Sequence, residues 1–317
     1  MASADAENFR LAVLNPGGRD QEQHFGENRS ATANGHAPVN FHAYAACTHG
    51  AVFRETKRAI ATEWPVLLLL RGDFRAAHQI AHQLSDPARF ARFLKIVREA
   101  NGGIATTPEA ADFFRLFRDN GIEFVPTPYP VEDENWNWAM ENRSGIFVGT
   151  REFAVPSRNH LAALVAVKRL SDVTKEPVTV FNFDRRRGAK LISEMGFRKI
   201  RVHEKRMSYR AYLGEVARHK IIFQLDRSRV PGQVAGDALL CRSACVGGDG
   251  AIERIAFPET CGEKRRDAQL VEIAQRLLTN ESERRAIAER ATNIAKEKLS
   301  FRAGRATLAH FFASCAF

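Results

Sequence analysis

The chain has 317 residues, 44% of them hydrophobic, a length that suits two α/β domains better than one small domain. Its formal charge of +10 favours polyanionic partners: a nucleic acid, an anionic membrane surface or a phosphorylated substrate. No apolar run approaches the roughly 20 residues of a membrane span, and the N-terminus lacks the pattern of a signal peptide. We therefore expect a cytoplasmic protein and leave open a peripheral place at the membrane. The five cysteines lack the spacing of a zinc site and are expected to be reduced thiols.

The first part of the chain alternates short apolar segments with helical patterns. In chain order, the expected elements are strands at 10–15, 65–72 and 103–107 and helices at 51–61, 86–102 and 108–121. Gly102 and Gly103 are expected to end the second of these helices. A proline-rich stretch, "VPTPYPVEDENWNW", then marks the boundary between two domains.

The second part of the chain is more regular. Expected strands lie at 145–150, 178–183, 199–203, 221–226 and 244–248, with helices between them, and three consecutive helices follow from residue 267. Ser157 is the expected N-cap of the helix after the first of these strands. Strands that alternate with helices indicate a parallel sheet, whose ligands bind outside the carboxyl ends of the strands.

We therefore predict an α/β fold of two Rossmann-like, doubly wound domains with a helical C-terminal tail. The first domain is expected at 1–130 and the second at 131–300. The C-terminal helix is expected at 301–317, with a return to the first domain left open. With two such domains, the natural ligand site is the cleft between them.

A turn and helix in the second domain, "VPGQVAGDALL", suggest an anion site. Small residues let the backbone approach a ligand closely, and amides at a helix start attract phosphate. Gly232, Gln233 and Val234 are therefore candidates to bind a diphosphate. Glu253, in the loop "VGGDGAIE", is a weaker candidate, because an ordinary turn explains it nearly as well.

The ordered set "FVGTRE", "VTVFNF", "KIRVH", "YRAYLGEVARHKIIFQLD" and "RVPGQVAGDALLCRSACVGGDGAIE" resembles the nucleotide-sugar domain of GT-B glycosyltransferases. The closest pattern is that of the retaining Glu-x7-Glu group, which is family 4-like. Gly232 matches the glycine of this signature and Asp237 matches its second acid, whereas Arg229 stands where the first Glu would fall. The resemblance implies that Asp237 binds the donor ribose, because a carboxylate accepts two hydrogen bonds from a vicinal diol. The alternative is an exposed aspartate in the first helical turn.

The same resemblance implies further roles. Arg151 and Arg158 would neutralise the donor diphosphate, since a guanidinium binds phosphate oxygens in pairs. Gly17 and Gly18 would form the loop that faces donor and acceptor. His42 and His49 are the catalytic candidates, for proton transfer or sugar orientation, against the alternative of ordinary loop histidines.

The predicted function is transfer of a hexosyl-like sugar from a UDP or GDP sugar to an unidentified acceptor, with retention. No metal constellation is visible, so we expect neither a metal nor another cofactor beyond the nucleotide sugar. The alternatives are a non-catalytic GT-B module that binds a polyanion or a partner enzyme, and a nucleotide-sugar epimerase. DNA, a modified base and a lipid at a membrane surface stay open as acceptors. Basic clusters at 185–206 and 264–305 are either polyanion surfaces or solvated faces.

Overall fold

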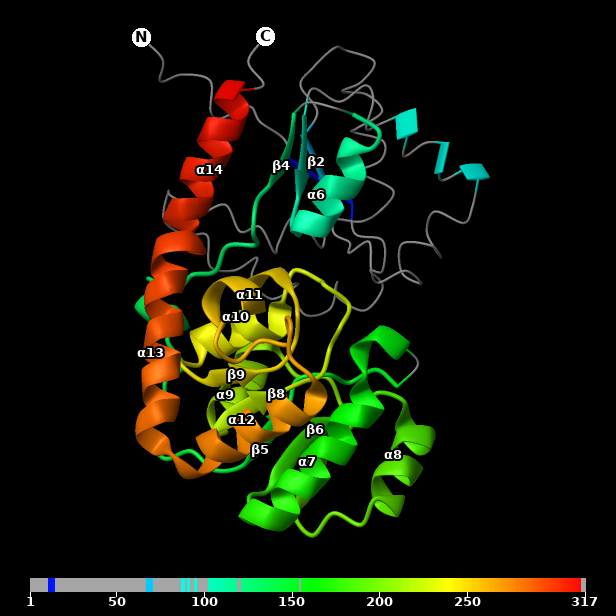
Figure 1. Ribbon diagram of the computed structural model, residues 1–317, viewed down its shortest axis with the longest axis vertical. Coiled ribbons are helices and arrows are strands. Elements are labelled where there is room, and N and C mark those ends of the chain that lie inside the picture. Colours follow the sequence, from blue (N-terminus) through cyan, green and yellow to red (C-terminus); the bar gives the residue numbers. More distant parts are fainter. Residues whose placement is uncertain are drawn as a thin grey trace. The chain divides into compact units, whose positions relative to one another are not determined.

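The structure is a computed structural model that describes residues 11–14, 67–70, 102–118, 121–153 and 155–314, with 87–88, 90–91 and 94–95 (Figure 1). The chain divides into two compact units. The first comprises Met1–Pro126 and Arg305–Phe317, and the second comprises Thr127–Gly304. No helix among the described residues is long and apolar enough to cross a membrane.

The first unit contains a parallel sheet of four strands in the order β1-β2-β3-β4. The strands are β1 (Leu11–Leu14), β2 (Leu67–Leu70), β3 (Gly102–Ala105) and β4 (Ile122–Phe124). Helix α6 (Pro108–Arg115) begins after Thr107, whose Oγ1 accepts a hydrogen bond from the Ala110 amide at 3.1 Å. It packs against β3 and β4 and buries Ala110, Ala111 and Phe114.

The helix expected at 86–102 does not include Gly102, whereas Gly103 lies in a strand, as the expected strand at 103–107 requires. Both residues lie in β3, which is hydrogen-bonded to β2 on one side and β4 on the other. All four residues of β3 are buried, so pairing within the sheet overrides the weak local preference of glycine.

The second unit is built on five parallel strands in the order β7-β6-β5-β8-β9. The strands are β5 (Ile146–Val148), β6 (Val178–Phe181), β7 (Ile200–His203), β8 (Ile221–Phe223) and β9 (Ala244–Val246). Every residue of β5, β6, β8 and β9 is buried, as expected when helices cover both faces of a parallel sheet. The predicted α/β fold with a parallel, Rossmann-like sheet is therefore confirmed for this unit.

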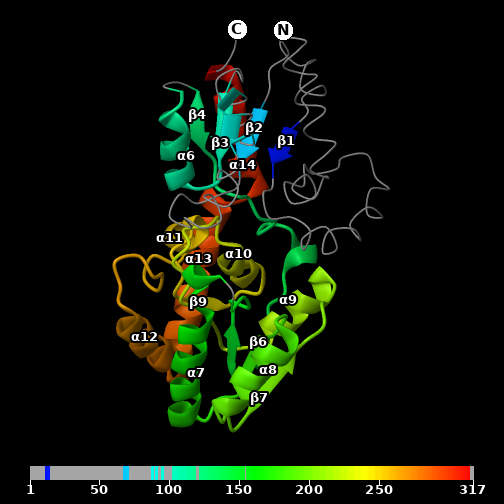
Figure 2. The ribbon, with the colours of Figure 1, turned by 90° about the vertical axis from the view of Figure 1, so that its right-hand side faces the viewer.

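Helices connect and cover these strands. They are α7 (His160–Thr174), α8 (Arg185–Glu194), α9 (Tyr209–Ala217), α10 (Gln233–Leu240), α11 (Ala251–Ala256), α12 (Asp267–Thr279) and α13 (Glu281–Lys298). Helix α14 (Phe301–Ser314) follows, and its residues from Arg305 on belong to the first unit. Helix α12 packs against α7, and α10 packs against α9. Figure 2 shows α7 and α12 on one side of the sheet and α9 on the other.

Two local predictions in this unit are wrong. Ser157 is not a helix N-cap: it lies in a 3-10 turn, Pro156–Arg158, and α7 begins after Asn159, which is left-handed at φ 49°. Glu253 does not lie in a loop, because α11 forms around it. A helix of six residues is too short for a periodic pattern to reveal it.

Candidate functional site

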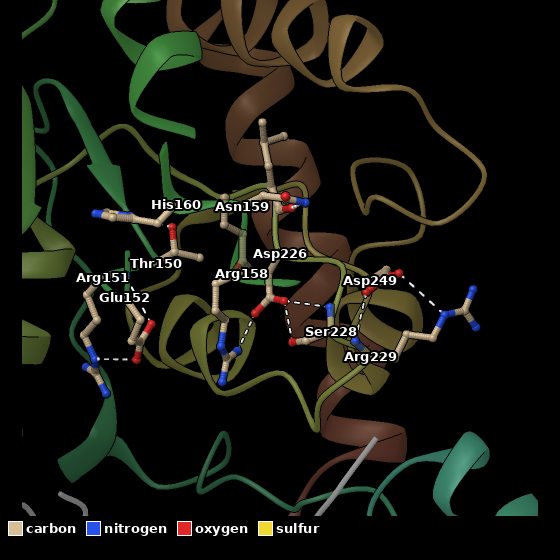
Figure 3. A network of polar contacts seen from close by, with 12 residues as sticks. Thr150, Arg151, Glu152, Arg158, Asn159, His160, Asp226, Ser228, Arg229 and Asp249 are labelled. Atoms are coloured by element: carbon tan, nitrogen blue, oxygen red, sulfur yellow. Dashed lines mark hydrogen bonds and ion pairs between the residues drawn. The ribbon is translucent and has the colours of Figure 1, made fainter. Parts of the chain in front are cut away.

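The order in which the chain adds strands to the second sheet reverses between the parallel neighbours β5 and β8. From β5 the chain moves outward through β6 to β7, and it then returns to β8 and continues to β9. Ligands of such sheets bind at the carboxyl ends of the strands beside this switch point. Here those ends lead into residues 149–159 after β5 and residues 224–232 after β8, the segments drawn in Figure 3.

Arg158 joins these two segments. Its Nη1 forms an ion pair with Oδ2 of Asp226, which also accepts hydrogen bonds on Oδ1 from the Ser228 amide at 2.8 Å and the Ser228 hydroxyl (Figure 3). Burial opposes the charge of Arg158, but the Asp226 carboxylate raises the pKa of the guanidinium above its usual value. The side chain keeps 23% of its surface exposed. Arg158 is thus a fixed cation that already shares its charge with one carboxylate.

Arg229 is also compensated by a carboxylate. Its backbone amide donates to Oδ1 of Asp249 at 3.1 Å, and its Nε lies 3.5 Å from Oδ2 (Figure 3). Burial raises the pKa of Asp249 above its usual range, and Arg229 opposes that shift. The backbone of Arg229 is left-handed at φ 48°. The cation at this signature position therefore belongs to an internal ion pair with the loop after β9.

Helix α10 starts at the switch point. Its N-cap, Gly232, has a φ of 96°, and a Cβ there would collide with Oε2 of Glu253. A Cβ on Gly149, just after β5, would lie 2.5 Å from Cγ1 of Val234. The first amides of a helix have no partner within it. The structure therefore places Gly232, Gln233 and Val234 beside the end of β5, where helix-start amides favour an anion.

Asp237 lies deeper than an exposed first-turn residue would. It is the fifth residue of α10 and only 2% exposed, so that alternative is wrong. The Tyr209 hydroxyl of α9 donates to its Oδ1 at 2.6 Å. Burial raises the pKa of Asp237 to about 7, although its hydrogen bonds oppose the shift.

Glu253 is a second buried carboxyl group near the start of α10. It is 2% exposed, and Gln224, which directly follows β8, donates from Nε2 to its Oε1 at 2.8 Å. Its Oε2 has no hydrogen-bond partner in the part of the chain that the structure describes. Burial raises the pKa of Glu253 to about 7.

The first residue of α7, His160, is a neutral histidine that the sequence did not single out. Nδ1 of His160 lies 3.0 Å from the Thr150 hydroxyl (Figure 3). The ring of Phe153 meets the imidazole edge-on, with the two ring centres 4.5 Å apart. Burial lowers the pKa of His160 to about 4. Arg151 follows β5 as well. Its Cζ lies 5.5 Å from the centre of the Phe183 ring, and its Nε lies 3.4 Å from Oε1 of Glu152. Arg151 and Arg158, both in the segment after β5, therefore have different partners.

Four predicted site residues, Gly17, Gly18, His42 and His49, lie outside the described residues. Their roles stay predictions. Within the described ranges, no group of three or more His, Cys, Asp or Glu side chains is arranged to hold a metal ion.

Comparison with known proteins shows similarity to solved structures. No protein-family model matches the chain, and no curated protein matches it. A UDP-forming α,α-trehalose-phosphate synthase from Burkholderia vietnamiensis matches 87% of this chain and 74% of its own, with 11% identity and a TM-score of 0.60. A TarM variant from S. aureus, crystallised with UDP, matches 79% of this chain and 51% of its own, with 12% identity and a TM-score of 0.60.

A glycosyltransferase from Rickettsia africae matches 82% of this chain and 79% of its own, with 12% identity and a TM-score of 0.54. At such identities these matches show the fold alone. They confirm, at that level, the resemblance to GT-B glycosyltransferases.

Proposed function

We propose that the chain binds a nucleotide sugar at the carboxyl ends of β5 and β8 and transfers the glycosyl group, with retention, to an acceptor. The observation that carries this proposal is the start of α10 at the switch point, with a left-handed Gly232 and the fixed cation of Arg158 on the neighbouring loop. The fold supports it, since similar structures include proteins crystallised with UDP.

In this proposal the donor diphosphate lies against the first amides of α10. The bond between the anomeric carbon and the diphosphate breaks, so negative charge grows on the leaving group. The amides of Gly232, Gln233 and Val234 and the guanidinium of Arg158 are fixed before the reaction and stabilise that charge. Asp226 shares Arg158 with the incoming phosphate, which keeps the guanidinium oriented.

The other donor-side roles follow from the resemblance. Asp237 binds the ribose, with Tyr209 holding the carboxyl group in place. Arg151 contributes a second positive charge to the loop after β5. The two-domain GT-B arrangement, the acceptor loop of Gly17 and Gly18 and the catalytic roles of His42 and His49 belong to the proposal as well.

Titration calorimetry with UDP and GDP tests the donor site. We expect the full chain to bind one of the two nucleotides. The double variant R158Q/D226N removes the ion pair without leaving an unpaired acid, and it should bind at least tenfold more weakly, given roughly 1.5–3 kcal/mol for a hydrogen bond to a charged group. K168Q/D172N is the matched control, because it removes an ion pair on α7, away from the loops of the site, and also leaves the net charge unchanged.

Two results would contradict the proposal. The first is a folded wild-type chain that binds neither nucleotide. The second is an equal loss of affinity in R158Q/D226N and in K168Q/D172N, which would show that the Arg158–Asp226 pair has no specific role in binding.

A second candidate function is a GT-B module that binds its ligand without transferring a sugar. The observation that favours it is the ion pair between Arg229 and Asp249, which occupies the position of the first signature acid. Mass spectrometry of UDP and GDP sugars incubated with the chain separates the two functions. Release of nucleotide supports transfer, whereas tight binding without release supports the module.

A further inference from the structure

The positive charge of the chain is concentrated at one edge of the second unit. Residues 185–210 contain ten of the 47 lysines and arginines but only two of the 37 acidic residues, a net charge of +8. They comprise α8, the edge strand β7 and the start of α9. This segment therefore accounts for most of the formal net charge of +10.

All ten of these cations are exposed, and six of them form neither an ion pair nor a cation–π contact with any residue in the described part of the chain. We call these six the β7 rim: Arg185, Arg186, Arg187, Arg198, Lys199 and Lys205. The arginines around α13 differ, because Arg276, Arg285 and Arg290 each pair with a glutamate. The charge of the β7 rim is thus available to an anionic partner, whereas that of α13 is largely compensated.

An apolar row lies on the neighbouring helix. Leu161, Val165 and Val173 of α7 are 48%, 57% and 57% exposed, and they make up three of the five large hydrophobic side chains exposed in the described ranges. Helices α7 and α8 are successive crossovers from β5 to β6 and from β6 to β7, so right-handed connections place them on the same face of the sheet. Figure 1 shows them side by side.

This combination distinguishes between two kinds of polyanion. Single-stranded nucleic acids bind on exposed aromatic rings, on which their bases stack. None of the five exposed large hydrophobic side chains in the described ranges is aromatic. A bilayer with anionic lipids instead offers phosphate groups for the basic side chains and an acyl boundary for aliphatic ones.

We propose that the face formed by α7, α8 and β7 docks on an anionic lipid bilayer. The β7 rim meets the lipid phosphates, and Leu161, Val165 and Val173 lie against the acyl boundary. This docking does not depend on the identity of the donor nucleotide or on catalysis. It would hold the second unit at the membrane surface.

Vesicle flotation with the full chain tests the proposal. We expect binding to vesicles of phosphatidylcholine mixed with phosphatidylserine, and little binding to phosphatidylcholine alone. The triple variant R185Q/R186Q/R187Q should lower the partition coefficient on the order of 100-fold, since each basic residue near the surface contributes roughly fivefold. The control R276Q/R285Q/R290Q removes the same charge around α13 and should retain nearly all binding.

A variant without a charge change separates the lipid from other polyanions. Val165→Ser should weaken binding to the mixed vesicles several-fold through the lost apolar contact. Circular dichroism checks that each variant is folded. Failure of the wild-type chain to bind mixed vesicles, or equal losses in both triple variants, would overturn the proposal. So would tighter binding to an oligonucleotide that the α8 triple variant abolishes and Val165→Ser leaves unchanged.

Discussion

Replacing Glu253 by glutamine should stabilise the second unit increasingly as the pH rises. Burial raises the pKa of this carboxyl group from 4.5 to about 7, so the folded state keeps the proton to a higher pH than the unfolded chain. The contribution of the protonated Glu253 to the free energy of unfolding is therefore fully present below about pH 4.5, and it is lost as the pH rises through about 7. At roughly 1.4 kcal/mol per pH unit, the ionised carboxylate costs about 3 kcal/mol. Glutamine removes that cost and still offers an oxygen to Gln224.

The measurement is urea denaturation followed by the fluorescence of tryptophan, since Trp136 and Trp138 both lie in the second unit. Between about pH 5 and about pH 8, the stability advantage of Glu253→Gln over the wild type should grow by about 2 to 3 kcal/mol. Burial also raises the pKa of Asp237, but its effect on the pH dependence of stability is the same in both proteins and cancels in the comparison. The exposed Glu272→Gln is the control and should show no such growth. An advantage for Glu253→Gln that stays constant or shrinks with pH would refute the reasoning.

Two other substitutions test the packing of the site. Arg158→Gln leaves the 4%-exposed Asp226 without its cation and should cost about 3 kcal/mol in urea unfolding. Adding Asp226→Asn should recover most of that loss, and additive effects would contradict the ion pair. Gly232→Ala should cost about 2 kcal/mol more than Gly196→Ala, because both positions have positive φ but only a Cβ at 232 meets other atoms, among them Oε2 of Glu253. Equal losses of stability would show that the positive φ alone, and not the collision of the added Cβ, determines the cost.

Much of the second unit follows from its sequence. The apolar runs at 178–183 and 221–226 are short, lie between helical patterns and contain the whole of the strands β6 and β8. Their regular alternation with helices predicts parallel strands, because a crossover helix is what connects such strands. The glycine at 232 was likewise recognisable, since the helix start needs a left-handed residue there.

The partners of the site residues did not follow from the sequence. Arg158 and Asp226 are 68 positions apart, and Tyr209 and Asp237 are 28 apart, so no local spacing connects them. Their contacts depend on which strands and helices become neighbours, and that order emerges only when the sheet is assembled. The burial of Asp237 is the clearest case, since the aromatic side chain that covers it comes from the preceding crossover helix.

The ion pair between Arg229 and Asp249 makes the residue that each position can accept depend on the residue at the other. A glutamate introduced at 229 alone would stand next to the buried Asp249, and two carboxylates would repel each other there. The residue that position 229 tolerates therefore depends on the residue at 249. Arg229→Glu is expected to fold well only when Asp249 is replaced by a neutral or basic residue at the same time, so the two positions act as one unit.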